Sequence, residues 1–207
     1  MLSRLQSLKR GQLWDQAAST IDDQFQKLVG AGADAVARLS DTALLARAIA
    51  GEATQVVRQK LFILTSLLKE AGDVAAAQDR LTESRSCYLK GLHLLLETLA
   101  RGDPAEFPEF VPRVDHFLSY LGTGPLPLPT EALLMRHYEL TGEFAKAEDR
   151  LFAMLDAEPE NRALLDFGLQ FYQRLQAKTD TALEAGNLPR AELDAGAADL
   201  RKRKQGQ

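Results

Sequence analysis

The sequence predicts an all-α fold made of antiparallel helical hairpins. Its composition is dominated by Ala, Leu, Gln, Glu, Arg and Lys, which favour helices. Apolar residues recur at steps of three and four, and the alternation typical of β-strands is scarce. Glycines and prolines separate these periodic stretches. We therefore expect seven or eight helices and no sheet in a chain of 207 residues.

The N-terminal part predicts two helices. The first is expected over residues 12–29, and its apolar stripe consists of Trp14, Ala17, Ile21, Phe25 and Leu28. The stretch GAGADAVARL that follows is expected to be a loop with at most one helical turn. Ser40 has a side chain suited to a helix N-cap, and it predicts a short helix over residues 40–50.

The longest predicted helix spans residues 53–78 and continues through Gly72. A glycine inside a helix costs about 1 kcal/mol relative to alanine. We expect a neighbouring helix to approach closely at Gly72 in compensation, and the alternative is a break in the helix at this residue. The next helix is expected over residues 82–101. Its inward face consists of Leu81, Ser84, Tyr88, Leu92, Leu95 and Leu99.

The C-terminal part predicts five further helices. The first is short and has Val114, Phe117, Leu118 and Leu121 on one side. Four helices follow, with Thr130 and Asn161 as expected N-caps and Gly142 and Pro189 in the turns. Their expected ranges are 130–141, 144–157, 161–185 and 189–202.

Two Pro-rich segments, GDPAEFPEFVPR and GTGPLPLPTE, interrupt this series. They are short and apolar, so we expect them to pack on the core through Phe107, Phe110, Leu126 and Leu128. The chain is accordingly expected to be a single helical domain, residues 1–207. The Pro-rich segments also suggest a subdivision into residues 1–101 and 130–203.

The stretch YELTGEFAKAEDRLFAMLDAEPEN has the spacing of a tetratricopeptide unit, which is two antiparallel helices in about 34 residues. Its characteristic positions are Tyr138, Gly142, Phe144, Ala147, Leu151 and Pro159. In such a unit the glycine reverses the chain, the large residues fill the groove between the helices, and the small alanine lets the two backbones come close. Because one helix pair cannot bury its own apolar faces, such pairs must stack.

Weaker versions of this spacing occur twice more. One consists of Gly72, Asp79, Leu81, Ser84, Tyr88 and Gly91, with an aspartate where glycine is usual. The other consists of Gly168, Tyr172, Gly186, Leu188 and Ala191, with a longer first helix than the standard unit. The expected architecture is therefore a tetratricopeptide-like superhelix of irregular hairpins.

The chain also resembles an uncharacterised bacterial family of tetratricopeptide-like proteins of unknown function. The segments that carry the resemblance are ARLSDTALLARAI, LTSLLKEAGDVAAAQ, CYLKGLHLLLETL and MRHYELTGEFAKAEDRLFAML, over roughly residues 10–160. The resemblance implies an all-α fold with irregular repeats. It implies no catalytic or binding residues.

Charge and composition exclude several classes of protein. The net charge is −4 and the charges are interspersed, so there is no electrostatic basis for binding nucleic acid. A membrane span needs about 20 apolar residues, and no such run exists. No secretory signal is visible. The single cysteine, Cys87, cannot form an intramolecular disulfide, and this suits a reducing, cytoplasmic location.

No arrangement of residues predicts chemistry. His93, His116 and His137 fall on three different helices without metal-ligand spacing, so we expect no metal and no cofactor. Cys87 lies near a helix start but has no adjacent histidine to act as a base. The basic run at residues 201–204 is expected to be a soluble helix end, where cations complement the macrodipole. The alternative is a contact for an acidic partner or an RNA phosphate.

The sequence thus favours a non-catalytic module that binds a protein or peptide. Stacked hairpins form a concave surface lined by the first helix of each pair. In the best unit, the side of that helix turned away from the core includes Glu131, Met135, Arg136 and Glu139. Arg136 and Arg174 are the candidate partner-binding residues. The alternatives are a homodimer formed through exposed apolar residues such as Trp14 or Phe110, and, less favoured, an enzyme or small-ligand receptor.

Overall fold

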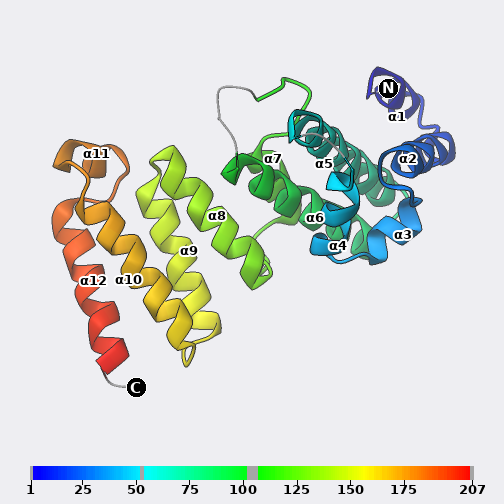
Figure 1. Ribbon diagram of the computed structural model, residues 1–207. Coiled ribbons are helices and arrows are strands. Elements are labelled where there is room, and N and C mark those ends of the chain that lie inside the picture. The colour runs from blue at the N-terminus through cyan, green and yellow to red at the C-terminus, as the bar shows by residue number, and fades with distance from the viewer. Residues whose placement is uncertain (1, 52–53, 102–106, 206–207) are drawn as a thin grey trace. The chain divides into compact units, whose positions relative to one another are not determined.

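The computed structural model describes residues 2–51, 54–101 and 107–205. Over these residues the chain forms twelve helices and no strand (Figure 1), which confirms the all-α prediction. The chain divides into two compact units, Met1–Pro125 and Leu126–Gln207. We call them unit 1 and unit 2 and describe each by itself.

Unit 1 contains seven helices and is built around the pair α5 and α6. Helix α2 packs on α5, and α7 packs on α6. The helices are α1 (Leu2–Arg10), α2 (Trp14–Val29), α3 (Ala33–Arg38), α4 (Asp41–Ile49), α5 (Thr54–Ala77), α6 (Leu81–Ala100) and α7 (Val114–Leu121). Ser40 caps α4 as predicted, because its Oγ accepts a hydrogen bond from the Ala43 amide at 3.1 Å.

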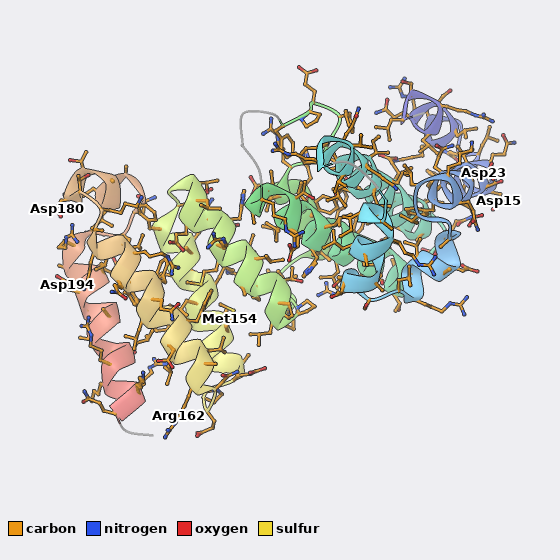
Figure 2. All side chains as sticks on the ribbon, viewed as in Figure 1. Asp15, Asp23, Met154, Arg162, Asp180 and Asp194 are labelled. Atoms are coloured by element: carbon orange, nitrogen blue, oxygen red, sulfur yellow. The ribbon has the colours of Figure 1, made fainter. Side chains whose placement is uncertain are left out.

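Unit 2 consists of two helix pairs, α8 with α9 and α10 with α12. The helices are α8 (Leu128–Thr141), α9 (Phe144–Ala157), α10 (Arg162–Gln176), α11 (Asp180–Ala185) and α12 (Arg190–Gln205). Apolar side chains such as that of Met154 fill the space between the helices, whereas Asp180 and Asp194 point outward into solvent (Figure 2). Asn161 caps α10 as predicted and accepts from the amides of Ala163 and Leu164.

Both the predicted count of seven or eight helices and the nine helices named one by one fall short of the twelve observed in the described ranges, because short helices were not recognised. Helix α1 buries Leu5 completely, although it is only nine residues long. The predicted loop after α2 contains the six-residue helix α3. The predicted helix 161–185 ends at Gln176, and Thr179 starts α11 by accepting from the Ala182 amide at 3.2 Å. In each case a local cap or a single buried residue stabilises a helix with little periodic pattern.

Three further expectations were wrong. Thr130 does not cap α8, because this helix begins at Leu128 and Thr130 is buried within it. Leu81 is 68% exposed, since it is the first residue of α6 and lies at the edge of the pair rather than inside it. Phe110 is 43% exposed, because only the other aromatic of its segment, Phe107, packs inward, edge-on against Phe62 at 5.7 Å.

Helix α5 continues through Gly72, so the alternative of a break there was wrong. The reason is the one expected. A Cβ atom at this position would collide with the ring of Tyr88, which crosses the glycine from α6. The same device recurs in unit 2, where a Cβ at Gly168 of α10 would lie 2.5 Å from the Leu200 side chain of α12. These glycines allow paired helices to approach more closely than any larger side chain permits.

Four helical turns share one backbone geometry, although only one uses glycine at the critical position. In these four turns the residues with positive φ are Gln12 (55°), Asp79 (59°), Gly142 (80°) and Asn187 (57°). In each turn the next amide bonds to the carbonyl five residues earlier: Leu13 to Leu8, Arg80 to Ala75, Glu143 to Tyr138 and Leu188 to Leu183, at 2.8 to 3.0 Å. This is the Schellman motif that ends many helices. Asp79 therefore has the conformation that the repeat pattern assigns to glycine.

This geometry predicts opposite effects of two substitutions. A residue with a side chain costs about 1 kcal/mol or more in the left-handed region, and glycine does not. We expect Asp79→Gly to stabilise unit 1 by about 0.5 to 1 kcal/mol and Gly142→Ala to destabilise unit 2 by about 1 kcal/mol. Urea unfolding followed by circular dichroism measures both changes. Two shifts of the same sign would contradict the assignment of Asp79 to the glycine position.

Candidate functional site

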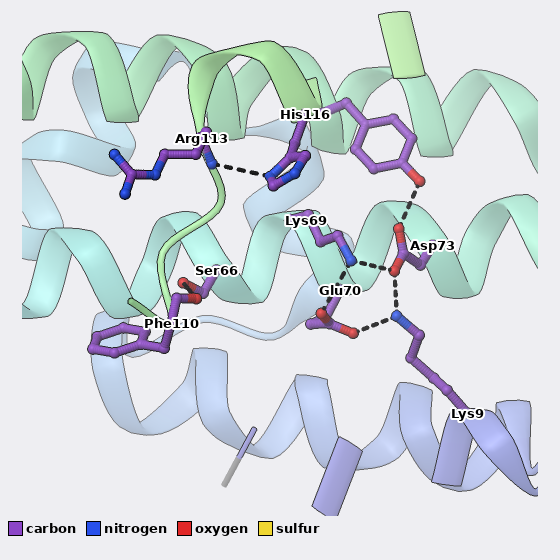
Figure 3. A network of polar contacts seen from close by, with 9 residues as sticks. Lys9, Ser66, Lys69, Glu70, Asp73, Phe110, Arg113 and His116 are labelled. Carbon is purple, nitrogen blue, oxygen red and sulfur yellow. Dashed lines mark hydrogen bonds and ion pairs between the residues drawn. The ribbon is translucent and has the colours of Figure 1, made fainter. Parts of the chain in front are cut away.

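An ion network joins α5 to α1. Lys69, Glu70 and Asp73 come from α5, and Lys9 reaches them from α1 (Figure 3). The Nζ atom of Lys9 lies 2.6 Å from Oε2 of Glu70 and also bonds to Asp73. The Nζ atom of Lys69 lies 2.8 Å from Oδ2 of Asp73. Two cations and two carboxylates therefore balance one another, and all four side chains are largely buried.

Asp73 is the centre of this network because it accepts three donors. Besides the two lysines, the Tyr88 hydroxyl donates to Oδ1 of Asp73 at 2.9 Å. Burial alone would raise the pKa of Asp73, but the hydrogen bonds from Lys69 and Lys9 outweigh it and hold the pKa below its ordinary value. Burial, followed by the charge of Asp73, raises the pKa of Tyr88. The carboxylate is thus ionised at neutral pH, and its charge is balanced by the two lysines.

An open hollow of about 500 Å³ lies beside Asp73 between α5, α6 and α7. One wall is aromatic, because the rings of Tyr88 and Tyr120 stack with centroids 4.6 Å apart. Tyr120 is 50% exposed, and the exposed Leu81 lies at the same hollow. We call it the first hollow. Its lining residues are Asp73, Ala76, Leu81, Ser84, Arg85, Tyr88 and Tyr120.

A second hollow of about 370 Å³ lies further along α5, toward α1. The segment before α7 forms one side of it, and this segment is fixed by a bond from Ser66 Oγ to the carbonyl of Phe110 at 3.3 Å. Lys69 lines the second hollow and bonds to Asp73 in the first, so the two hollows meet at the ion network. We refer to these two neighbouring hollows together as the α5 groove.

Arg85 gives the first hollow its positive charge. Its Nη1 donates to the Leu121 carbonyl at 2.8 Å, and its Nη2 donates to the Pro125 carbonyl at 3.1 Å. These bonds hold the guanidinium at the C-terminal end of α7. Among the residues that the structure describes, Arg85 pairs with no carboxylate. The charge of Asp73, by contrast, is balanced by the two lysines.

The two arginines predicted to bind a partner lie in unit 2, outside the α5 groove. Arg174 on α10 forms a two-point ion pair with Glu139 on α8, at 2.6 Å (Nε–Oε1) and 2.8 Å (Nη2–Oε2). The hydrogen bond to Glu139 raises the pKa of Arg174. Arg136 is exposed on α8. Of the other two residues expected on that surface, Glu131 and Met135 are both buried, so that part of the expectation was wrong.

The buried Glu131 gives a testable effect of pH. Its Oε2 has no hydrogen-bond partner among the described residues, and Arg150 Nη1 lies 3.7 Å away. Burial raises the pKa of Glu131, which means that the ionised form is less stable in the folded chain than in the unfolded chain. The contribution of protonated Glu131 to the free energy of unfolding is therefore present below its unfolded pKa, and it is lost as the pH rises through its folded pKa.

We therefore expect Glu131→Gln to stabilise unit 2 by about 1 kcal/mol at pH 7 and to give no gain at pH 3. Urea unfolding of both proteins at the two pH values measures this difference. Glu160→Gln, at an exposed position, is the control and should change neither curve. A destabilised E131Q at pH 7 would show that the ion pair with Arg150 outweighs burial.

His116 and Cys87 have contacts that suit a structural role. His116 Nδ1 accepts from the Arg113 amide at 3.2 Å, at the start of α7. Burial raises the pKa of the Cys87 thiol to about 11, so it is not a thiolate at neutral pH. In the basic run, Arg203 pairs with Asp199 and Lys204 with Asp166, which suits the end of a soluble helix. Within the described ranges, no three His, Cys, Asp or Glu side chains are grouped to hold a metal ion.

Residues 21–205 match the model of a family of unknown function (DUF6483). The chain belongs to this family. The match confirms the resemblance to an uncharacterised family. No curated protein and no solved structure matches the chain. In this DUF6483 protein Glu70 and Asp73 lie within the matched range, whereas Lys9 precedes it. No helix in the described part of the chain is long and apolar enough to cross a bilayer.

Sequence reasoning missed the α5 groove of this DUF6483 protein. Tyr88 was recognised as an inward residue, and Leu81 was placed with it, so neither was considered for a surface. The available signal was the charge pattern of α5. Lys69 and Asp73 are four residues apart and lie on one face of the helix, and Glu70 lies beside them. The contribution of Lys9 from α1 had no signal, because that helix was not predicted.

Proposed function

We propose that this DUF6483 protein is a non-catalytic, tetratricopeptide-like module that binds a polypeptide segment in its α5 groove. The observation that carries the proposal is the first hollow, whose open aromatic wall has Leu81 and Tyr120 exposed beside it. Exposed apolar side chains that surround a hollow are typical of binding surfaces. The shared Schellman turns support stacked hairpins. The lone Cys87 supports a cytoplasmic location.

The titratable groups of the groove favour binding over catalysis. A general acid or base is most effective when its pKa lies near the working pH. Here the pKa of Asp73 is lowered, and the pKa values of Lys69 and Tyr88 are raised. For Lys69, burial opposes the rise, and the hydrogen bond to Asp73 outweighs it. The pKa of each group is therefore shifted further from 7, so the network is better suited to a fixed structural role than to proton transfer.

Self-association receives less support from the residues considered for it. Trp14 is partly buried and packs against the core of unit 1, so little of it is available to a second copy. Phe110 is exposed, but it lies at the second hollow and belongs to the same groove. Tyr120 and Phe110 thus lie at neighbouring hollows on the same side of α5 as Lys69 and Asp73, which supports the binding of a separate polypeptide segment there.

A photo-crosslinking amino acid at position 81 tests the proposal in the native cell. Position 140 is a matched control, because Leu140 is also a largely exposed leucine but lies in unit 2. We expect one dominant crosslinked polypeptide from position 81, lost when Tyr120→Ser is added, and none in common from position 140. Crosslinks only to a second copy of the chain would favour the homodimer. Equal products from both positions, or none, would reject the groove as a binding site.

A further inference from the structure

We infer that the polypeptide segment bound in the first hollow is acidic and apolar, with a carboxylate side chain that pairs with Arg85 beside an apolar side chain that covers Leu81 and Tyr120. This inference rests on the proposed function and specifies the chemistry of the partner. It follows from how the charged groups around the hollow are satisfied, from the exposed apolar residues, and from the geometry of the guanidinium.

The negative charge in the hollow is already balanced by lysines of the chain itself. Asp73 and Arg85 are the charged residues that line the first hollow. Asp73 already accepts hydrogen bonds from Lys9, Lys69 and Tyr88. The neighbouring carboxylate of Glu70 interacts with the same two lysines. A lysine or arginine of a partner would add a further positive charge beside two carboxylates that the two lysines already balance. A basic segment is therefore disfavoured at this end of the groove.

Among the residues that the structure describes, the positive charge of Arg85, by contrast, is met by two backbone carbonyls and by no carboxylate. Arg85 uses one N–H on each of two nitrogens for the carbonyls of Leu121 and Pro125. A guanidinium has five N–H donors in a fixed planar arrangement, so three remain. The two carbonyl bonds also fix the orientation of the group before anything binds. A carboxylate is the partner that such a fixed guanidinium recognises best.

The apolar part of the partner follows from Leu81 and Tyr120. Both are at least half exposed, and both line the hollow that contains Arg85. Stacking on Tyr88 fixes the orientation of the Tyr120 ring. The Nζ atom of Lys69, which belongs to the ion network, lies 5.9 Å from the centroid of that ring. A branched or aromatic side chain that enters the hollow removes these surfaces from water. The segment must therefore present an apolar residue and an acidic residue close together.

Selection from a random library of displayed twelve-residue peptides, against the full chain, tests both parts of the inference. Parallel selections use the wild type, Leu81→Ser with Tyr120→Ser, Arg85→Gln, Ala76→Glu and Ala76→Lys. Ala76 lines the same hollow near the end of α5. Its two variants therefore change the charge of the hollow while Arg85 itself is kept. Circular dichroism of each variant confirms that the chain is folded.

We expect wild-type binders that depend on Leu81 and Tyr120 and are enriched in Asp or Glu next to an apolar residue. Their affinity should fall about tenfold in R85Q and A76E and rise in A76K. Binders that depend on Leu81 and Tyr120 but show no acidic preference, or prefer Lys and Arg, would overturn the inference and leave the proposed function standing. Binders that ignore Leu81 and Tyr120, or no binders, would overturn both. Because the wild-type and Ala76 selections are decisive by themselves, a misfolded R85Q does not weaken the test.

Discussion

Phe117→Ala is expected to destabilise unit 1 by about 3 to 5 kcal/mol, the usual cost of truncating a buried phenylalanine. Phe117 is completely buried and attaches α7 to α6, where its ring lies over Gly91. Helix α7 carries Tyr120, so the loss of this anchor should also weaken the aromatic wall of the first hollow. Trp14 is the only tryptophan of the chain and lies in unit 1, so its fluorescence during urea unfolding reports this unit.

Gly91 supplies the control for this prediction. A Cβ at Gly91 would lie 2.6 Å from the Phe117 ring, so Gly91→Ala should destabilise the wild-type chain by about 1 to 3 kcal/mol. In the F117A background the methyl group has room, and alanine should be favoured over glycine in the helix by about 1 kcal/mol. A change of sign between the two backgrounds therefore tests the contact itself. The same loss in both backgrounds would show that Phe117 does not pack on Gly91.

Asp73→Asn is expected to cost about 2 to 3 kcal/mol, which is near the lower end for breaking a buried ion pair because the lysines are partly solvated. The substitution leaves Lys9 and Lys69 with Glu70 alone. It also removes the negative charge that the Tyr88 hydroxyl faces. Trp14 fluorescence during urea unfolding again measures the loss in unit 1.

The dependence on pH identifies the cause of this loss. The pKa of Asp73 is lowered in the folded chain, so its contribution is present above the unfolded pKa of about 3.9 and is lost as the pH falls through the folded pKa. The stability difference between wild type and D73N should therefore be full at pH 7 and shrink below about pH 4. Asp23→Asn, at an exposed carboxylate on α2, is the control. A difference that is constant with pH would mean that packing, not charge, explains the loss.

The long periodic elements could be predicted from the sequence, because their hydrophobic faces are wide enough to appear in one dimension. Helix α9 was predicted with its observed bounds, and α5 within one residue at each end. The close approach at Gly72 followed from the cost of glycine in a helix. The short helices α1, α3 and α11 could not be predicted in this way, since one buried residue such as Leu5, Val36 or Leu183 gives no period.

The candidate site was less predictable because it depends on residues that come together only in the fold. Lys9 and Asp73 are 64 positions apart in sequence. Arg85 acquires its orientation from carbonyls that belong to the end of α7 and the segment after it. Arg174 was selected as a candidate partner-binding residue, and in the fold its guanidinium pairs with Glu139 within unit 2. Charge in the sequence indicates which residues can bind, and only the fold shows which of them are already satisfied.

The four Schellman turns have a consequence for recognising related chains. Because main-chain bonds define the reversal, a glutamine, aspartate or asparagine can replace glycine there at a modest cost. A motif that demands glycine at that position finds the turn at Gly142 and overlooks the other three. A chain with few glycines can therefore contain more helical hairpins than a search for a glycine consensus counts. The number of hairpins is better established from backbone torsion angles than from residue identities.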